Sequence, residues 1–475
     1  MKKIAVSLIL IFSSLFSYSS HFMGGEITWQ CIKGGPDVGK YIFQMKVYRD
    51  CNGITFSQTS QTLTHHNYPS LGTTTPILLN FVSVTDISPT GSVASGNTCV
   101  DCASGQLGGV EEYVWRSDPM ILGGTPPAEG WHFTWGSCCR SSNITNGMND
   151  ESWTLRAVMY PYTDPATGNA LPADPCYDSS PKFEEQAKTI ICTGYEFSYS
   201  HNAFDDELDE IVYSWGEPLG DAFAYDPANP NATALAFDPP YTVNSPIPGA
   251  PTLESSTGEI TYNSNTAGVF VTCIKVEAFK CGQLVAEIYR EVQVLLIDCG
   301  LYTQPQDGFN DPPTITEAFT DPATGLPTYE TTVYAGQLVQ FNIEAEDLDT
   351  YAGGQLQQIT LDADGGQFAS DYVTVNNCAN PPCATFNNGA GVTPPFSAPG
   401  IVSGVFEWQT DCSHMTADVG CNTTSNIANL IKRCVFSNFG KCNFRNNCEV
   451  CKCRCTHIMK KRFSIIRKTT GSIWH

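Results

Sequence analysis

The stretch Thr193–Trp215 reads TGYEFSYSHNAFDDELDEIVYSW, and its first half alternates between apolar and polar residues. Such alternation is typical of a half-buried strand, whose inward face here carries Phe197, Tyr199 and His201. Five acids follow within six residues, and a second run of strand-forming residues then begins at Ile211. The stretch therefore predicts two strands joined by an acidic loop.

The same arrangement recurs 142 residues later in GQLVQFNIEAEDLD, Gly336–Asp349. Further along, GEITY from Gly258 corresponds to GVFEW from Gly404, 146 residues apart. Two copies of a strand that leads into an acidic loop predict two copies of one β-domain.

The composition favours β structure and excludes one class of partner. The chain has 475 residues with 40 glycines and 30 prolines, which suits many turns between short strands. Its formal net charge of −23 has the wrong sign for binding nucleic acid. We predict an all-β protein made of tandem immunoglobulin-like or PKD-like β-sandwich domains that follow an N-terminal β-rich domain.

The N-terminus is typical of a secretory signal peptide. Lys2 and Lys3 supply the positive charge, and Ile4–Phe16 supply an apolar core. The serine-rich stretch Ser17–Ser20 supplies the small residues of the cleavage region. The rival interpretation is an uncleaved membrane anchor. No other segment approaches the roughly 20 apolar residues that a transmembrane helix needs. We therefore expect a secreted or surface-displayed protein with no transmembrane segment after signal cleavage, which meets an extracellular surface, a polysaccharide or a protein ligand.

Changes in pattern and composition predict six segments. They are a signal peptide (1–20), an N-terminal β-rich domain (21–192), a first sandwich (193–299), a linker (300–330), a second and incomplete sandwich (331–427), and a basic cysteine-rich tail (428–475). The tail holds a single acid, Glu449, and six of the 21 cysteines. A loss of the reading frame near Ile427 is the interpretation that we favour; a natural basic tail and a zinc site within Cys448–His457 are the alternatives.

Several motifs together give a family resemblance. They are GGEITWQC (Gly24–Cys31), KVYRDCNG (Lys46–Gly53), WGSCCRSSNITN (Trp135–Asn146) and SSPKF (Ser179–Phe183), followed by the acidic strand and loop. In this order the motifs resemble large secreted surface proteins of gliding bacteria of the phylum Bacteroidota. The resemblance implies PKD-like or cadherin-like repeats, type IX secretion and a link to gliding motility.

No catalytic motif of a hydrolase, a nucleotide-binding enzyme or a metalloprotease is present in the sequence. We therefore predict a non-catalytic structural or adhesion protein. The alternative is a carbohydrate-binding accessory region of a secreted hydrolase, with Trp115, Trp131 and Trp135 as candidate platforms. His65 and His66 are expected to be an exposed loop pair, and His201 a core residue with satisfied hydrogen bonds.

The cysteines predict disulfides in an oxidising compartment. Fifteen of the 21 precede the tail, and their connectivity does not follow from spacing. Local pairs that each bracket one loop are the expectation: Cys31/Cys51, Cys176/Cys192, Cys378/Cys383 and Cys412/Cys421. The Cys99-x-x-Cys102 spacing also allows a redox pair, although a structural role is the more usual one in an exported β-protein.

The acidic loops predict weak calcium binding. Asp205, Glu207 and Asp209 stand at alternate positions and can converge on one hard cation, as can Asp347 and Asp349. The related family's first loop resembles D-x-D-G-D, from which this chain departs at Glu207 and Leu208. The competing interpretation is an acidic, solvated loop that binds no ion.

Overall fold

The computed structural model describes residues 22–297 and 314–410, each range with short gaps, together with 457–458. The fold is all-β, as predicted: the described residues form strands and one short 3₁₀ helix, η2 (Ala222–Ala224). None of their helices is long and apolar enough to cross a membrane.

The largest sheet has 11 strands and includes both ends of the 22–297 range. Its members are β1 (Phe22–Cys31), β2 (Tyr41–Asp50), β3 (Gln61–His66), β4 (Ile77–Asp86), β7 (Val110–Ser117), β8 (Trp131–Ser137), β9 (Trp153–Met159), β11 (Ile190–Cys192), β14 (Glu210–Trp215), β17 (Gly268–Lys280) and β18 (Gln283–Ile297). Smaller pairings beside it involve β5 (Ser92–Val93), β6 (Thr98–Cys99), β10 (Lys182–Phe183), β12 (Glu196–Ser200), β13 (Ala203–Phe204), β15 (Thr252–Leu253) and β16 (Glu259–Asn263).

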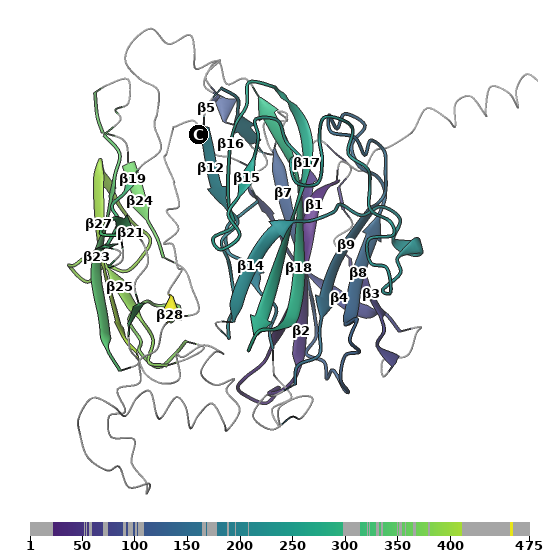
Figure 1. The fold of residues 1–475 in the computed structure, drawn as a ribbon, viewed down its shortest axis with the longest axis horizontal. Coiled ribbons are helices and arrows are strands. Elements are labelled where there is room, and N and C mark those ends of the chain that lie inside the picture. The colour runs from purple at the N-terminus through teal and green to yellow at the C-terminus, as the bar shows by residue number, and fades with distance from the viewer. Residues whose placement is uncertain are drawn as a thin grey trace, which may run out of the picture.

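Strand β18 is the centre of this sheet (Figure 1). One edge pairs along its length with β17, through a two-residue turn in which Cys281 and Gly282 both have positive φ. That backbone matches the right-handed twist of a hairpin. The other edge pairs in succession with β9, β1 and β11. A single late strand therefore joins segments from the whole of 22–297.

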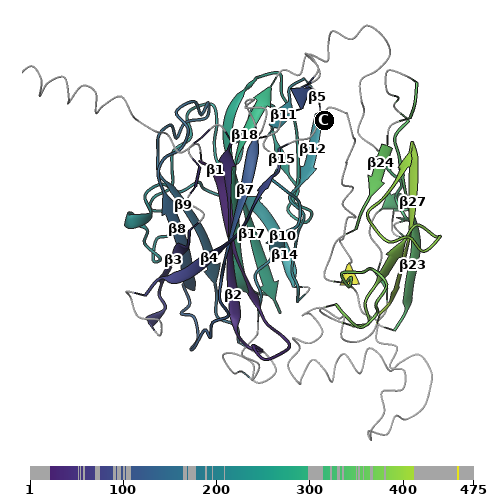
Figure 2. The same ribbon diagram turned by 180° about the vertical axis from the view of Figure 1, so that it is seen from behind.

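The early strand β1 approaches β18 very closely at Gly24, the third residue of the strand. Gly24 faces Val292 in the pairing, and a Cβ atom at Gly24 would collide with the carbonyl oxygen of Glu291. The GG of the GGEITW motif thus serves the joint between the first and last strands of the sheet, which lie side by side in both views (Figure 2).

The predicted boundary at residue 192 does not separate two cores. One hydrophobic cluster runs from Phe22 to Leu296 and takes side chains from both predicted domains. The inward faces of β2 and β9 are buried within it, for example Phe43 and Trp153. Alternation shows which face of a strand is buried but not which strands pair, so the sequence divided one folded unit into two.

A second unit has its own core and repeats part of the first. Its strands are β19 (Thr314–Ile315), β20 (Phe319–Thr320), β21 (Pro327–Thr328), β22 (Thr332–Val333), β23 (Leu338–Glu346), β24 (Gln358–Leu361), β25 (Thr385–Asn387), β26 (Phe396–Pro399), β27 (Ile401–Gln409) and β28 (His457–Ile458). Because β19 pairs with β23, the later part of the predicted 300–330 linker belongs to this unit.

The predicted repeat is visible in the strand pairing. In the first copy β12 pairs with β16, Tyr199 opposite Ile260; in the second, β23 pairs with β27, Phe341 opposite Phe406. These are the positions that the sequence matched, 142 and 146 residues apart. The backbone bond from Gly194 to Ser264 likewise recurs from Gly336 to Thr410. Both copies therefore share one register.

Two predictions about the C-terminal part lie outside the described residues. The proposed loss of frame near Ile427 and the incomplete last strands fall within 411–456. The alternative zinc site falls there too, apart from His457 in β28, which pairs with β22.

Candidate metal centre

The acidic loop after β13 meets a buried segment that sequence reasoning had not connected with it. Asp178 lies just before β10, and β10 pairs with β13, which leads directly into Asp205. As a result, carboxylate oxygens of Asp178, Asp205 and Glu207 all lie within 4.8 Å of one another. Asp178 is fully buried and Asp205 is 3% exposed.

The loop owes its shape to the first of its acids. One oxygen of Asp205, Oδ1, accepts the backbone N–H groups of Glu207 (2.8 Å) and Asp209 (3.1 Å). Side-chain bonds of this kind curl a chain locally. The base of the loop is fixed by the Tyr213 hydroxyl, which accepts from the N–H of Ala203 and donates to its carbonyl oxygen.

Glu207 is fixed by the SSPKF motif. Ser179 donates its hydroxyl to Glu207 Oε1 at 3.0 Å and its backbone N–H to Oε2 at 3.2 Å. The same hydroxyl oxygen accepts from the N–H of Cys31, at the end of β1. Lys33 Nζ lies 2.8 Å from Glu207 Oε1, at the exposed side of the cluster. Three separate stretches of chain therefore converge on this carboxylate.

Asp178 is the least satisfied member of the cluster. Neither of its carboxylate oxygens accepts a hydrogen bond from a nitrogen or hydroxyl donor, although its carboxyl group lies within hydrogen-bond reach of Asp209; the second oxygen of Asp205, Oδ2, has no partner. The nearest cation to Asp178 is Lys280 Nζ, 3.9 Å from Oδ1, and this ammonium is already paired with Asp209. Leaving charged oxygens buried without partners is costly.

Burial decides the protonation of the cluster. It raises the pKa of Asp178 well above its ordinary value; Lys280 opposes that rise, and the neighbouring carboxylates reinforce it. Burial also raises the pKa of Asp205, with Glu207 and Asp209 adding to the effect. For Lys280, burial acts against the charged form, but Asp178 and Asp209 outweigh it and raise the pKa. When its carboxyl groups are ionised, the cluster thus carries more negative charge than its surroundings stabilise.

The predicted calcium ligands are brought together only in part. Asp205 and Glu207 converge as expected, but Asp209 turns to Lys280, and Asp178 takes its place. In the second copy Asp347 is buried and donates its backbone N–H to the carbonyl oxygen of Gly400, while Asp349 lies outside the described residues. Nothing in the pattern around Asp178 marks it as buried, since the neighbouring serines are ordinary loop residues.

Two charged residues of the motifs quoted above, Glu26 and Arg140, are also buried and paired. Glu26 accepts from Arg290 and from the Tyr48 hydroxyl, joining β1, β18 and β2. Arg140 pairs with Glu291 (Nη2 to Oε2, 3.3 Å) and stacks on the Trp153 ring at 3.8 Å. Since Arg290 and Glu291 are successive residues of β18, these two pairs lie on opposite faces of the sheet.

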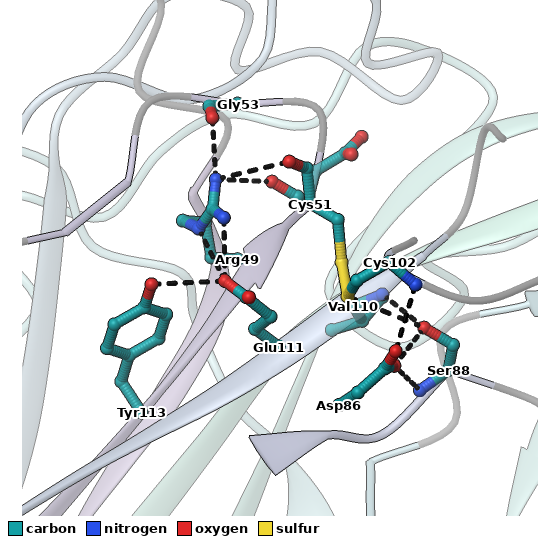
Figure 3. Close-up of a disulfide and its surroundings, with 10 residues drawn as sticks. Arg49, Cys51, Gly53, Asp86, Ser88, Cys102, Val110, Glu111 and Tyr113 are labelled. Atoms are coloured by element: carbon teal, nitrogen blue, oxygen red, sulfur yellow. Dashed lines mark hydrogen bonds and ion pairs between the residues drawn. A yellow bond between two sulfur atoms is a disulfide. The ribbon is translucent and has the colours of Figure 1, made fainter. Parts of the chain in front are cut away.

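The KVYRDC motif contains one cysteine of the Cys51–Cys102 disulfide and the arginine that holds its loop (Figure 3). Arg49 donates to Glu111 Oε2 and to the carbonyl oxygens of Asp50 and Gly53, which fixes the loop that follows β2. Cys51 in this loop is bonded to Cys102.

On the other side of that bond, Asp86 accepts the backbone N–H of Cys102 at 2.9 Å. Burial acts to raise the pKa of Asp86, but hydrogen bonds from Ser88 and Cys102 outweigh it and lower the pKa. The disulfide is thus held on both sides by charged groups.

The disulfides agree with the predicted pairs in one case. Cys378 is bonded to Cys383 as expected, whereas the predicted Cys31/Cys51 pair is wrong because Cys51 is bonded to Cys102. The same bond excludes a Cys99/Cys102 redox pair. The neighbours Cys138 and Cys139 are bonded to each other. Cys31 and Cys281 each take part in a disulfide too. Cys176/Cys192 and Cys412/Cys421 involve residues outside the described part.

Two further sets of predicted residues occupy other places than expected. Trp115, Trp131 and Trp135 are at most 7% exposed, so they pack the core and offer no flat surface to a sugar. His65 and His66 lie in strand β3 and bond to Thr75 and Thr134, and are not an exposed loop pair. His201 is buried as expected, but its Nδ1 has no hydrogen-bond partner.

No family model matches the chain, and a search of curated proteins finds no match either.

Proposed function

We infer that the chain is a non-catalytic structural or adhesion protein of the cell exterior, in which rigid β units in series hold a binding surface away from the cell. The observation that carries this proposal is the way in which the motifs that give the family resemblance are built into the fold. Their charged residues, Glu26, Arg49 and Arg140, are engaged inside the fold by partners on other strands. Charged groups that are paired inside the fold stabilise the structure, so we assign the motifs a structural role.

Two further observations support the proposal. The strand register repeats between the two units, which is typical of modular proteins that act by length and stiffness. The cross-links at Cys51–Cys102 and Cys378–Cys383 fit an oxidising compartment such as the cell exterior. A place in surface attachment or gliding motility, and PKD-like identity of the units, rest on the sequence resemblance.

The test is a deletion of the gene in the source organism, with complementation by the full chain. We expect an antibody against the folded protein to label intact cells, and cell attachment to a surface under flow to fall on deletion and recover on complementation. Label confined to the cell interior, or attachment unchanged by deletion, would contradict the proposal. Binding of the purified chain to one class of glycan on an array would favour the carbohydrate-binding alternative.

A further inference from the structure

We propose that Asp178, Asp205 and Glu207 bind one calcium ion, which ties the acidic loop to the buried segment before β10. The site differs from the one that the loop sequence predicts, because its central ligand is supplied from outside the loop. The three carboxylates come together through the pairing of β10 with β13.

The geometry of the oxygens suits a shared ion. Calcium binds oxygen ligands at about 2.3–2.6 Å, so that oxygens on opposite sides of one ion are about 5 Å apart. One carboxylate oxygen from each of the three residues lies within 4.8 Å of the other two. A set of ligands made only of carboxylates selects a hard cation over zinc or copper.

The unpartnered oxygens indicate where an ion is needed. Asp178 is fully buried and neither of its oxygens accepts a hydrogen bond from a nitrogen or hydroxyl donor, and Asp205 Oδ2 is unbonded on the same cluster. Asp205 uses its other oxygen, Oδ1, to shape the loop, so Oδ2 is the oxygen left to bind an ion. The loop is thus already curled for binding.

The charges of the cluster also suit a divalent cation. Four carboxylates gather here, those of Asp178, Asp205, Glu207 and Asp209, against the ammonium groups of Lys280 and Lys33. Two negative charges remain when all six groups are ionised. One calcium ion balances them, and it leaves Asp209 to its pair with Lys280.

The experiment compares calcium binding by the full-length oxidised protein and two variants, followed by calorimetric titration and by the midpoint of thermal unfolding. Wild type should bind with a Kd on the order of 10⁻⁴–10⁻³ M, and its midpoint should rise with calcium relative to chelator. Asp178→Asn should raise the Kd for calcium at least tenfold and abolish the calcium-dependent rise in the unfolding midpoint. Its midpoint in chelator should equal or exceed that of wild type, because the substitution removes a buried carboxyl group that is costly to ionise.

Asp206→Asn is the matched control. Asp206 stands in the same loop but pairs with Lys182 and is not one of the three converging carboxylates, so this variant should bind calcium as wild type does. If Asp178→Asn does not fold, Asp205→Asn tests the same ligand set. The proposal is overturned if wild type fails to bind at about 10⁻² M calcium, far above the Kd of extracellular sites. It is overturned equally if Asp178→Asn keeps the wild-type shift, or if magnesium binds as tightly as calcium.

Discussion

At the scale of single residues, the fold depends on charged side chains that are buried in pairs. Arg290 is 1% exposed and Glu26 2%, and they face each other across β18 and β1. Burial acts to raise the pKa of Glu26, but Arg290 and Lys46 outweigh it and lower the pKa. The carboxylate is therefore ionised in the folded protein, and the pair contributes stability above the ordinary carboxyl pKa that is lost as the pH falls through the lowered value.

Removing one member of this pair should be far more damaging than removing a surface ion pair. We expect Glu26→Gln to lower the free energy of unfolding by about 3–5 kcal/mol, because it leaves the Arg290 charge buried without its counter-ion. Asp37→Asn is the control, since Asp37 pairs with Lys40 at a half-exposed site, and its cost should be under about 1 kcal/mol. Denaturant unfolding measures both. Equal costs would show that the buried pair is not a major support.

The sequence could not have revealed this residue-scale organisation. Asp178 is separated from Asp205 by 27 positions, and no spacing rule connects them. Glu26 and Arg290 are 264 residues apart. Charged residues in a strand pattern are ordinarily read as solvent-facing, and only the three-dimensional pairing shows that these are buried. The two members of the acidic cluster that the sequence did predict, Asp205 and Glu207, are the two that are local in sequence.

At the scale of strands and turns, sequence patterns were much more informative. Alternation identified β12 and β23, and the two-residue turn at Cys281 and Gly282 joins β17 to β18. These features are local, because a strand face and a two-residue turn depend on neighbouring residues alone. Disulfide pairing is not local, and there the expectation of short loops misassigned Cys51.

Gly258 tests whether the turn before β16 is as constrained as its surroundings indicate. Its φ is +67°, and a Cβ atom there would collide with the Tyr213 ring, whose hydroxyl holds Ala203 below the acidic loop. Gly282 has a similar φ of +69° but open space around it. We expect Gly282→Ala to cost roughly 1–2 kcal/mol from backbone strain alone.

Gly258→Ala should cost at least about 1 kcal/mol more than its control, because the collision with Tyr213 adds to the same strain. Chemical denaturation of the two variants side by side gives the difference. If both substitutions cost the same, then the Tyr213 ring moves freely and does not fix the base of the loop.

At the scale of the whole molecule, residues 22–297 form one unit whose parts depend on β18. The strand pairs with β17 on one edge and with β9, β1 and β11 on the other. Residues on both sides of the predicted boundary at 192 share one sheet and one core, and long-range pairing of this kind leaves no periodic trace in a sequence. The predicted repeat agrees with the strand pairing because both copies keep the matched positions in the same register. A rigid first unit followed by a partial copy suits a structural protein.

The most direct test is hydrogen exchange of the full-length oxidised protein, followed by mass spectrometry. Amides that open together share one opening free energy. We predict that peptides from β1, β9, β17 and β18 exchange with a common opening free energy, and that β23 and β27 share a separate value. Strong protection of β1 and β9 while β17 and β18 exchange freely would contradict the single unit. It would also contradict the claim that the motifs behind the family resemblance serve to build that unit.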